Sequence, residues 1–116
     1  MKPQPPAYFR FTDASGKYFV IKLNDKEKIA HARRILSGDE VEFVHVSAKI
    51  VKEKADYNPN WNYHLSPDSI EFFGYAIEVC DATMEYVEEN LNDAGGAFLP
   101  NNHWCPWSSF FVDEIS

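Results

Sequence analysis

The sequence predicts an α+β domain, with two helices packed on a largely antiparallel sheet of about four to five strands. Apolar residues alternate with polar ones in several short stretches, which is typical of half-buried strands. Two other stretches carry apolar residues at helical spacing behind a capping residue. The predicted elements follow the order strand, strand, helix, strand, strand, helix, loop, strand, and this order favours antiparallel strands covered by helices.

The length and composition fit a single globular domain. With 116 residues, 45% of them hydrophobic and 16% aromatic, the chain can build a core, which argues against disorder. Its net charge of −7 argues against a nucleic-acid partner, because phosphate binding needs clustered Lys and Arg. No apolar run reaches transmembrane length and no signal peptide is recognised. We expect a flexible Pro-rich lead-in at 1–6, a single domain at 7–116, and a secreted or extracytoplasmic location if a signal peptide has been removed.

The first half of the domain is predicted to be a hairpin followed by a helix. Residues 8–12 and 18–23 alternate in polarity and flank a turn, as the two strands of a hairpin do. Asn24 is predicted to cap a helix over 25–37, because a capping-box pattern follows it. Gly38 stands where helices commonly end in a left-handed residue.

The second half of the domain is predicted to repeat the order of strands and helix. Residues 41–52 alternate as a long strand, and 61–65 form a short extended piece. Residues 70–80 are apolar on both faces, which indicates a central strand. Asp81 is predicted to cap a second helix over 82–93, with its glutamates mostly on the outer face.

An apolar loop at 95–107 separates the second helix from a last predicted strand at 108–115. Its glycines and prolines exclude a regular element, and it holds two of the three tryptophans. Such a loop must pack on the domain or bind a ligand, and we expect it to meet residues 61–68. The predicted binding residues are Trp61, Tyr63, His64, Leu99, His103, Trp104 and Trp107. An aromatic platform for a sugar, peptide or partner side chain and plain core packing both stay open at this point.

Cys80 and Cys105 lie in the two stretches that are expected to meet, so we predict that they come within bonding reach. A disulfide between them would close a loop of about 25 residues, and two buried thiols are the alternative. We interpret both cysteines and the helix cap Asp81 as structural. His64 is predicted to be a structural, hydrogen-bonded histidine tied to Glu78 or to the apolar loop.

The residue patterns for metal and catalytic sites are weak. His64, Cys80, His103 and Cys105 match no standard zinc spacing. The start of a calcium loop at Asp56 lacks the Gly and the Glu that such a loop requires. No metal and no cofactor are therefore predicted. No cysteine-enzyme motif surrounds Cys105, so we predict that the protein is not an enzyme.

Six stretches of the chain resemble a known family. They are Tyr8-Phe-Arg-Phe-Thr-Asp13, Phe19-Val-Ile-Lys-Leu23, Ala32-Arg-Arg-Ile-Leu36, Trp61-x-Tyr-His-Leu-x-Pro-Asp-Ser-Ile70, Ala76-Ile-Glu-Val-Cys-Asp81 and Trp104-Cys-Pro-Trp-Ser108. They are similar to the N-terminal domain family of the slime-mould cAMP-inducible prestalk calmodulin-binding protein, which has short single-domain bacterial relatives. The resemblance covers nearly the whole chain, implies a calmodulin-binding-like module and carries over no catalytic residue.

Our first functional hypothesis is a small, monomeric, non-enzymatic binding domain that recognises a protein or other ligand through the aromatic loop surface. One alternative is an inhibitor of a secreted protease that presents the 95–107 loop near Leu99. A second alternative is a small hydrolase that uses Cys105 and a histidine. We expect a protein partner, and we expect neither a nucleic acid nor a membrane as partner.

Overall fold

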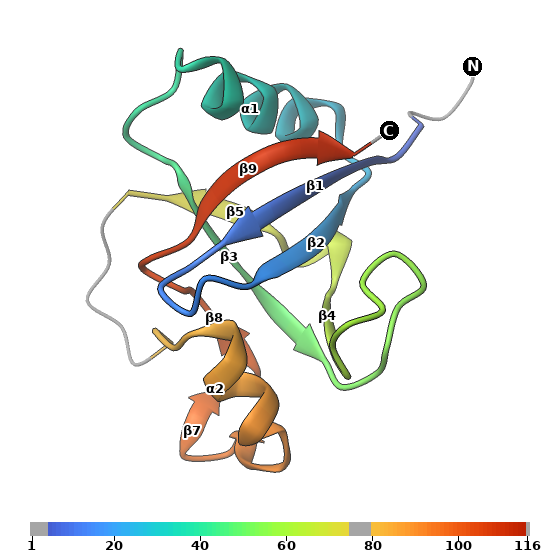
Figure 1. Ribbon diagram of the computed structural model, residues 1–116, viewed down its shortest axis with the longest axis vertical. Coiled ribbons are helices and arrows are strands. Elements are labelled where there is room, and N and C mark those ends of the chain that lie inside the picture. Colours follow the sequence, from blue (N-terminus) through green and yellow to red (C-terminus); the bar gives the residue numbers. More distant parts are fainter. Residues whose placement is uncertain (1–4, 75–79, 116) are drawn as a thin grey trace.

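The computed structural model describes residues 5–74 and 80–115 (Figure 1). Two antiparallel sheets pack on each other, with a long helix at one end of the molecule and a short helix at the other. The expected α+β class is confirmed, but the single sheet with two full helices is corrected to this arrangement. Residues 1–4 of the predicted lead-in lie outside the described residues.

The first sheet has the order β2-β1-β9 and contains the predicted hairpin. Strands β1 (Ala7–Thr12) and β2 (Tyr18–Leu23) pair antiparallel, and β9 (Phe110–Ile115) pairs with the other edge of β1. Alternation sends one face of each strand into the core, including Phe9 and Phe11 from β1. The predicted strand positions are confirmed to within a few residues.

The second sheet is organised around β3 (His45–Val51). This strand pairs antiparallel with β4 (His64–Leu65), β5 (Glu71–Phe73) and β8 (His103–Trp104). The predicted strand at 41–52 is four residues too long at its start. The carboxylate of Glu40 accepts hydrogen bonds from the amides of Glu42 and Phe43, so the chain turns there before the strand begins.

The predicted central strand at 70–80 is seen only in part. Its residues Glu71–Phe73 form β5, and a short 3₁₀ turn, Pro67–Ser69, precedes them. Residues 75–79 lie outside the described residues, and Glu78 is among them.

The loop at 95–107 is more regular than its sequence indicates. It contributes β7 (Phe98–Pro100), which pairs in parallel with β6 (Ala94–Gly95), and it supplies β8 to the second sheet. The prediction of a loop without strands is therefore wrong. The packing of Trp104 in the core provides the reason, because it brings the backbone beside β3 at Ala48.

The long helix α1 (Lys26–Ser37) confirms the most regular helical pattern in the sequence. Its cap is Asp25, whose carboxylate accepts from the amide of Glu27, and the predicted cap Asn24 is wrong by one residue. Gly38 ends the helix in the left-handed region with φ of 90°, as predicted. In the described residues, neither helix is long and apolar enough to cross a membrane.

The second helix is much shorter than the predicted span of 82–93. Helix α2 covers Met84–Glu89, and a separate 3₁₀ turn at Leu91–Asp93 follows it. Thr83 caps α2 by accepting a hydrogen bond from the amide of Tyr86. The predicted cap Asp81 is wrong, because its carboxylate accepts from the amide of Trp107 instead.

The core between the two sheets is largely aromatic. The ring of Phe19 lies at its centre, with centroid distances of 5.1 Å to Tyr63, 5.4 Å to Trp104 and 6.1 Å to Trp61. Such tilted and edge-on pairs stabilise the packing beyond the area that they bury. The core therefore joins residues that are distant in sequence, and it fixes the segment around Trp61 against the first hairpin.

Candidate functional site

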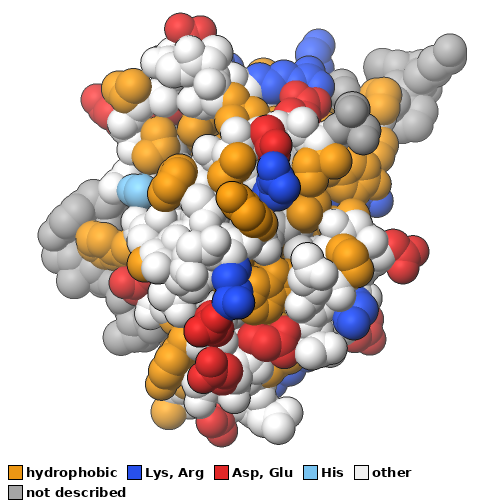
Figure 2. All heavy atoms as spheres, viewed as in Figure 1, with side chains coloured by type: hydrophobic (Ala, Val, Ile, Leu, Met, Phe, Trp, Pro, Cys, Tyr) orange, Lys and Arg blue, Asp and Glu red, His pale blue; other side chains and the backbone are white. Residues whose placement is uncertain are grey.

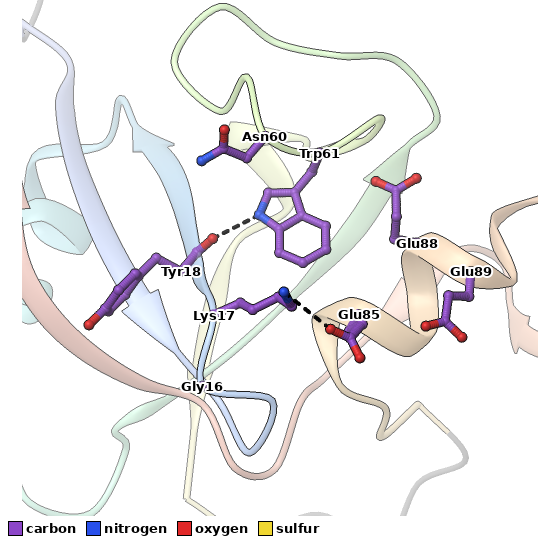
Figure 3. A pocket seen from close by; sticks show the side chains of 8 residues that line it. All are labelled: Gly16, Lys17, Tyr18, Asn60, Trp61, Glu85, Glu88 and Glu89. Atoms are coloured by element: carbon purple, nitrogen blue, oxygen red, sulfur yellow. Dashed lines mark hydrogen bonds and ion pairs between the residues drawn. The ribbon is translucent and has the colours of Figure 1, made fainter.

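A pocket of about 650 Å³ lies between the turn of the first hairpin, the segment before β4 and helix α2 (Figure 3). The residues that line it are Gly16, Lys17, Tyr18, Asn60, Trp61, Glu85, Glu88 and Glu89. Three segments separated by more than 20 residues of sequence thus contribute to one cavity. A concave site of this size that combines an aromatic ring with polar groups is a candidate ligand site.

The indole of Trp61 forms the aromatic wall of the pocket. Its Nε1 donates a hydrogen bond of 2.7 Å to the backbone oxygen of Tyr18, which fixes the ring against β2. Only 6% of Trp61 is exposed, so the ring presents an edge to the pocket while its faces pack in the core. The wall is therefore rigid and already formed without a ligand.

Helix α2 supplies the charge of the pocket. Glu85, Glu88 and Glu89 lie three and four residues apart, which places them on one side of the helix. Acidic side chains gather over the part of the surface where α2 lies (Figure 2). Lys17 is the one cation among the lining residues, so their formal charge is negative.

The contacts of Glu85 and Glu88 differ in kind. The Lys17 Nζ lies 3.4 Å from Glu85 Oε2, and both side chains are about half exposed, at 53% and 48%. Glu88 is held more firmly, because it accepts from both the backbone amide and the side-chain amide of Asn62, at 2.7 Å and 3.0 Å. No hydrogen bond or ion pair is seen for the Glu89 side chain within the described residues.

Buried polar groups fix the position of α2 beside the pocket. Asp13, only 5% exposed, accepts a hydrogen bond of 2.7 Å from the amide of Met84 at the start of the helix. The hydroxyl of Tyr63 donates to the backbone oxygen of the same residue. Burial raises the pKa of Tyr63, and the negative charges of Glu88 and Asp13 raise it further. The phenol therefore stays protonated and keeps this bond.

Most of the residues predicted to bind a ligand lie in the core. Trp61 is nearly buried, and Tyr63, Leu99 and Trp104 are fully buried. Trp104 also donates its Nε1 hydrogen to the backbone oxygen of Ala82. The interpretation of these side chains as an exposed aromatic platform is not supported, because they satisfy one another in the core. Of this group, Trp61 alone lines the pocket.

The other three predicted residues lie outside the pocket lining. His64 is half-buried, its Nδ1 lies 2.7 Å from the backbone oxygen of Glu53, and its ring meets Tyr57 edge-on. It is thus hydrogen-bonded as predicted, with a different partner from the expected Glu78 or apolar loop. His103 is exposed in β8, and Trp107 is half-buried with its ring 6.4 Å from Phe73.

Cys80 and Cys105 form a disulfide, with their Cα atoms 5.1 Å apart. The amide of Cys105 also donates to the backbone oxygen of Cys80, at 2.9 Å. The prediction that the pair lies within bonding reach is confirmed. In the described residues, no group of three or more acidic, His or Cys side chains is placed to hold a metal ion.

The pocket residues Lys17, Glu85, Glu88 and Glu89 were not among the predicted site residues. Their sequence signal is the spacing of the three glutamates along one helical side, which is also the usual signature of a solvated face. Nothing in the sequence places Lys17 beside that face. The pocket becomes visible only when the hairpin turn, Trp61 and α2 are brought together.

The chain was compared with known proteins and protein families. A family model for the N-terminal domain of the prestalk calmodulin-binding protein matches residues 5–116. No curated protein and no solved structure matches the chain. The match extends over nearly the whole sequence and agrees with the resemblance carried by the tryptophan-containing stretches. The chain therefore belongs to the family of domains that is named after the N-terminal part of this calmodulin-binding protein.

Proposed function

We propose that this protein is a small non-enzymatic binding domain whose pocket receives a side chain of a protein partner. The observation that carries the proposal is the preformed pocket, in which a fixed indole edge stands opposite the acidic side of α2. The ring and the helix are already held by core contacts, so a ligand meets a site that needs little reordering. This proposal moves the site from the 95–107 loop to the pocket beside Trp61.

The two alternative functions have less support from the geometry. An inhibitory loop must offer a side chain to a protease, but Leu99 is fully buried. A cysteine nucleophile must be a free thiolate, but Cys105 is in a disulfide and only 1% exposed. No second function is proposed.

Selection from a random-peptide display library tests the binding function. The domain, with its disulfide intact, is used as bait, and an unrelated domain of similar charge removes non-specific binders. Enriched peptides are then tested on Asn60→Trp, which places a bulky ring in the pocket, and on Asn92→Trp. Asn92 is an exposed residue of the 3₁₀ turn after α2 and does not line the pocket.

We expect peptides that bind the unmodified domain and Asn92→Trp but lose most of their affinity for Asn60→Trp. Equal binding to both variants would place the binding surface elsewhere on the domain. A library that yields no peptide enriched over the unrelated domain would reject the binding function.

A further inference from the structure

The pocket already holds a cation from its own chain. The side chain of Lys17 reaches across the cavity below the indole of Trp61, and its ammonium lies 3.4 Å from Glu85 (Figure 3). An ammonium group is therefore compatible with the shape and the charge of this site. This internal cation is an observation separate from the acidity of α2, and it indicates which chemistry the pocket accommodates.

The lining carries more negative charge than Lys17 neutralises. Three carboxylates face one ammonium, so a second cation entering the pocket is attracted and not repelled. Glu88 keeps its orientation through Asn62, and Glu89 has no intramolecular partner in the described residues. The indole edge adds an apolar surface for the methylene stem of a long basic side chain.

The Lys17–Glu85 contact is also easy to displace. Both side chains are about half exposed, and exposed ion pairs contribute little because water and salt screen them. A ligand cation that contacts Glu85 and Glu89 together would replace this pair with a less exposed one. The loss of the internal contact is therefore a small cost of binding.

We propose that the pocket takes a protonated lysine or arginine side chain of the partner protein, and that Lys17 is an internal occupant which this side chain displaces. The inference rests on the proposed binding function and specifies the chemistry of its ligand. It has a consequence that a passive acidic surface would not show: removing a positive charge at position 17 strengthens binding of a cation beyond the effect of removing another lysine.

NMR titration with short peptides tests this inference. The peptides are blocked Gly-X-Gly, in which X is lysine, arginine, norleucine, phenylalanine or glutamate. The indole Nε1–H resonance of Trp61 reports on the pocket, because Trp61 lines it. The Nε1–H of Trp104 is the internal control, because that ring is fully buried and bonded to Ala82.

We expect the lysine and arginine peptides to shift the Trp61 resonance with weak affinity, on the order of 1 mM, and to leave Trp104 unchanged. Raising the salt concentration from about 0.02 M to about 0.5 M should weaken both interactions. Lys17→Gln should strengthen them by about 2- to 5-fold, and Glu89→Gln should weaken them by a similar factor. The matched controls are Lys26→Gln on α1 and Glu71→Gln on β5, both exposed and outside the pocket lining.

The possible outcomes separate this inference from the binding function itself. Norleucine or phenylalanine peptides that shift Trp61 as strongly as lysine would overturn the cation assignment and leave the pocket as a binding site. Lys17→Gln with no more effect than Lys26→Gln would overturn the displaced-occupant role. Spermidine binding that is more than about tenfold tighter than the peptides would assign the pocket to a free polyamine instead of a partner side chain. No shift with any peptide overturns the inference, and the display selection then decides the binding function independently.

Discussion

The carboxylate of Asp13 accepts a hydrogen bond of 2.7 Å from the backbone amide of Met84, 71 residues further along the chain. Its other oxygen accepts from the amide and the hydroxyl of Ser15 in the hairpin turn. One buried carboxylate therefore holds together the turn of the first hairpin and the start of α2. These are two of the three walls of the pocket, so their relative position depends on this side chain.

Asp13→Asn is expected to destabilise the fold. An amide keeps the size of the side chain but replaces one accepting oxygen with a donor, which leaves the Met84 or the Ser15 amide without its partner. The expected loss is about 1–3 kcal/mol of the free energy of unfolding, measured from denaturant midpoints. Asp56→Asn is the control, because Asp56 is exposed. An equal, small effect of both substitutions would contradict the role of Asp13.

Trp61→Ala and Trp107→Ala should differ in their effects on stability. Trp61 is 6% exposed and packs on Phe19 and Tyr63, so its truncation should cost about 3–5 kcal/mol. Trp107 is only half-buried, so its truncation should cost less. Urea denaturation of both variants measures the difference. A small loss for Trp61→Ala would show that the ring is not part of the core.

Removal of the disulfide should destabilise the domain without changing its fold. The bond joins residues that are 25 positions apart, and closing a loop of that length stabilises by roughly 3 kcal/mol in the chain-entropy model. We expect the Cys80→Ala/Cys105→Ala double variant to unfold at lower denaturant concentration by that amount. Mass spectrometry should show that neither cysteine of the unmodified protein reacts with iodoacetamide before reduction. Labelling of the native, unreduced protein is the result that this assignment cannot accommodate.

Two glycines form a matched pair for a test of close packing. A Cβ added at Gly74 would meet the backbone oxygen of Glu42 within 2.4 Å, whereas at Gly96 the nearest atom is 3.5 Å away. Gly74→Ala should therefore force a backbone shift and cost about 1–3 kcal/mol. Gly96→Ala should be tolerated, or should stabilise by about 0.4–1 kcal/mol through the unfolded state. Thermal unfolding of the two variants should rank them in that order, and the reverse order would refute the close contact.

The contact between α1 and β9 should depend on acid pH. Arg33 donates from Nε and Nη2 to the two oxygens of Glu114, at 2.9 Å and 2.8 Å. The hydrogen bond from Arg33, followed by its positive charge, holds the pKa of the Glu114 carboxyl below its usual value of 4.5. The folded state therefore binds this proton less readily than the unfolded state does. The stabilisation is present above pH 4.5 and is lost as the pH falls through the lowered folded value.

Glu114→Gln removes this dependence. The unmodified protein should be more stable than the variant at neutral pH, and the difference should disappear on acidification below the folded pKa. Glu71→Gln on β5 is the control and should show no such convergence. A difference that persists at low pH would mean that Glu114 acts by packing and not by charge.

The disulfide and the first hairpin show how much of this protein follows from local sequence patterns. The alternation at 8–12 and 18–23 was enough to predict β1 and β2, because a strand buries every second side chain wherever it lies. Helix α1 followed from its apolar spacing and from Gly38. Cys80 and Cys105 were predicted to meet because each lies in an apolar stretch that needs a partner.

The tertiary structure alone decided what the aromatic side chains do. Trp61, Tyr63 and Trp104 have the same composition signal whether they pack or bind, because both uses remove an apolar ring from water. Their burial depends on Phe19, which comes from a strand about 40 residues earlier than Trp61. The length of α2 was decided in the same way, since Asp81 caps no helix once it accepts the amide of Trp107.

The sequence by itself thus determined the elements whose residues lie close together in the chain: the hairpin, α1 and the last strand. The pocket belongs to the tertiary structure, since Lys17, Trp61 and Glu85 come from three separate segments. Periodicity reports which face of an element is apolar, but it carries no distance between elements. That distance is set by the packing of the core and by Asp13, which fixes α2 against the hairpin turn.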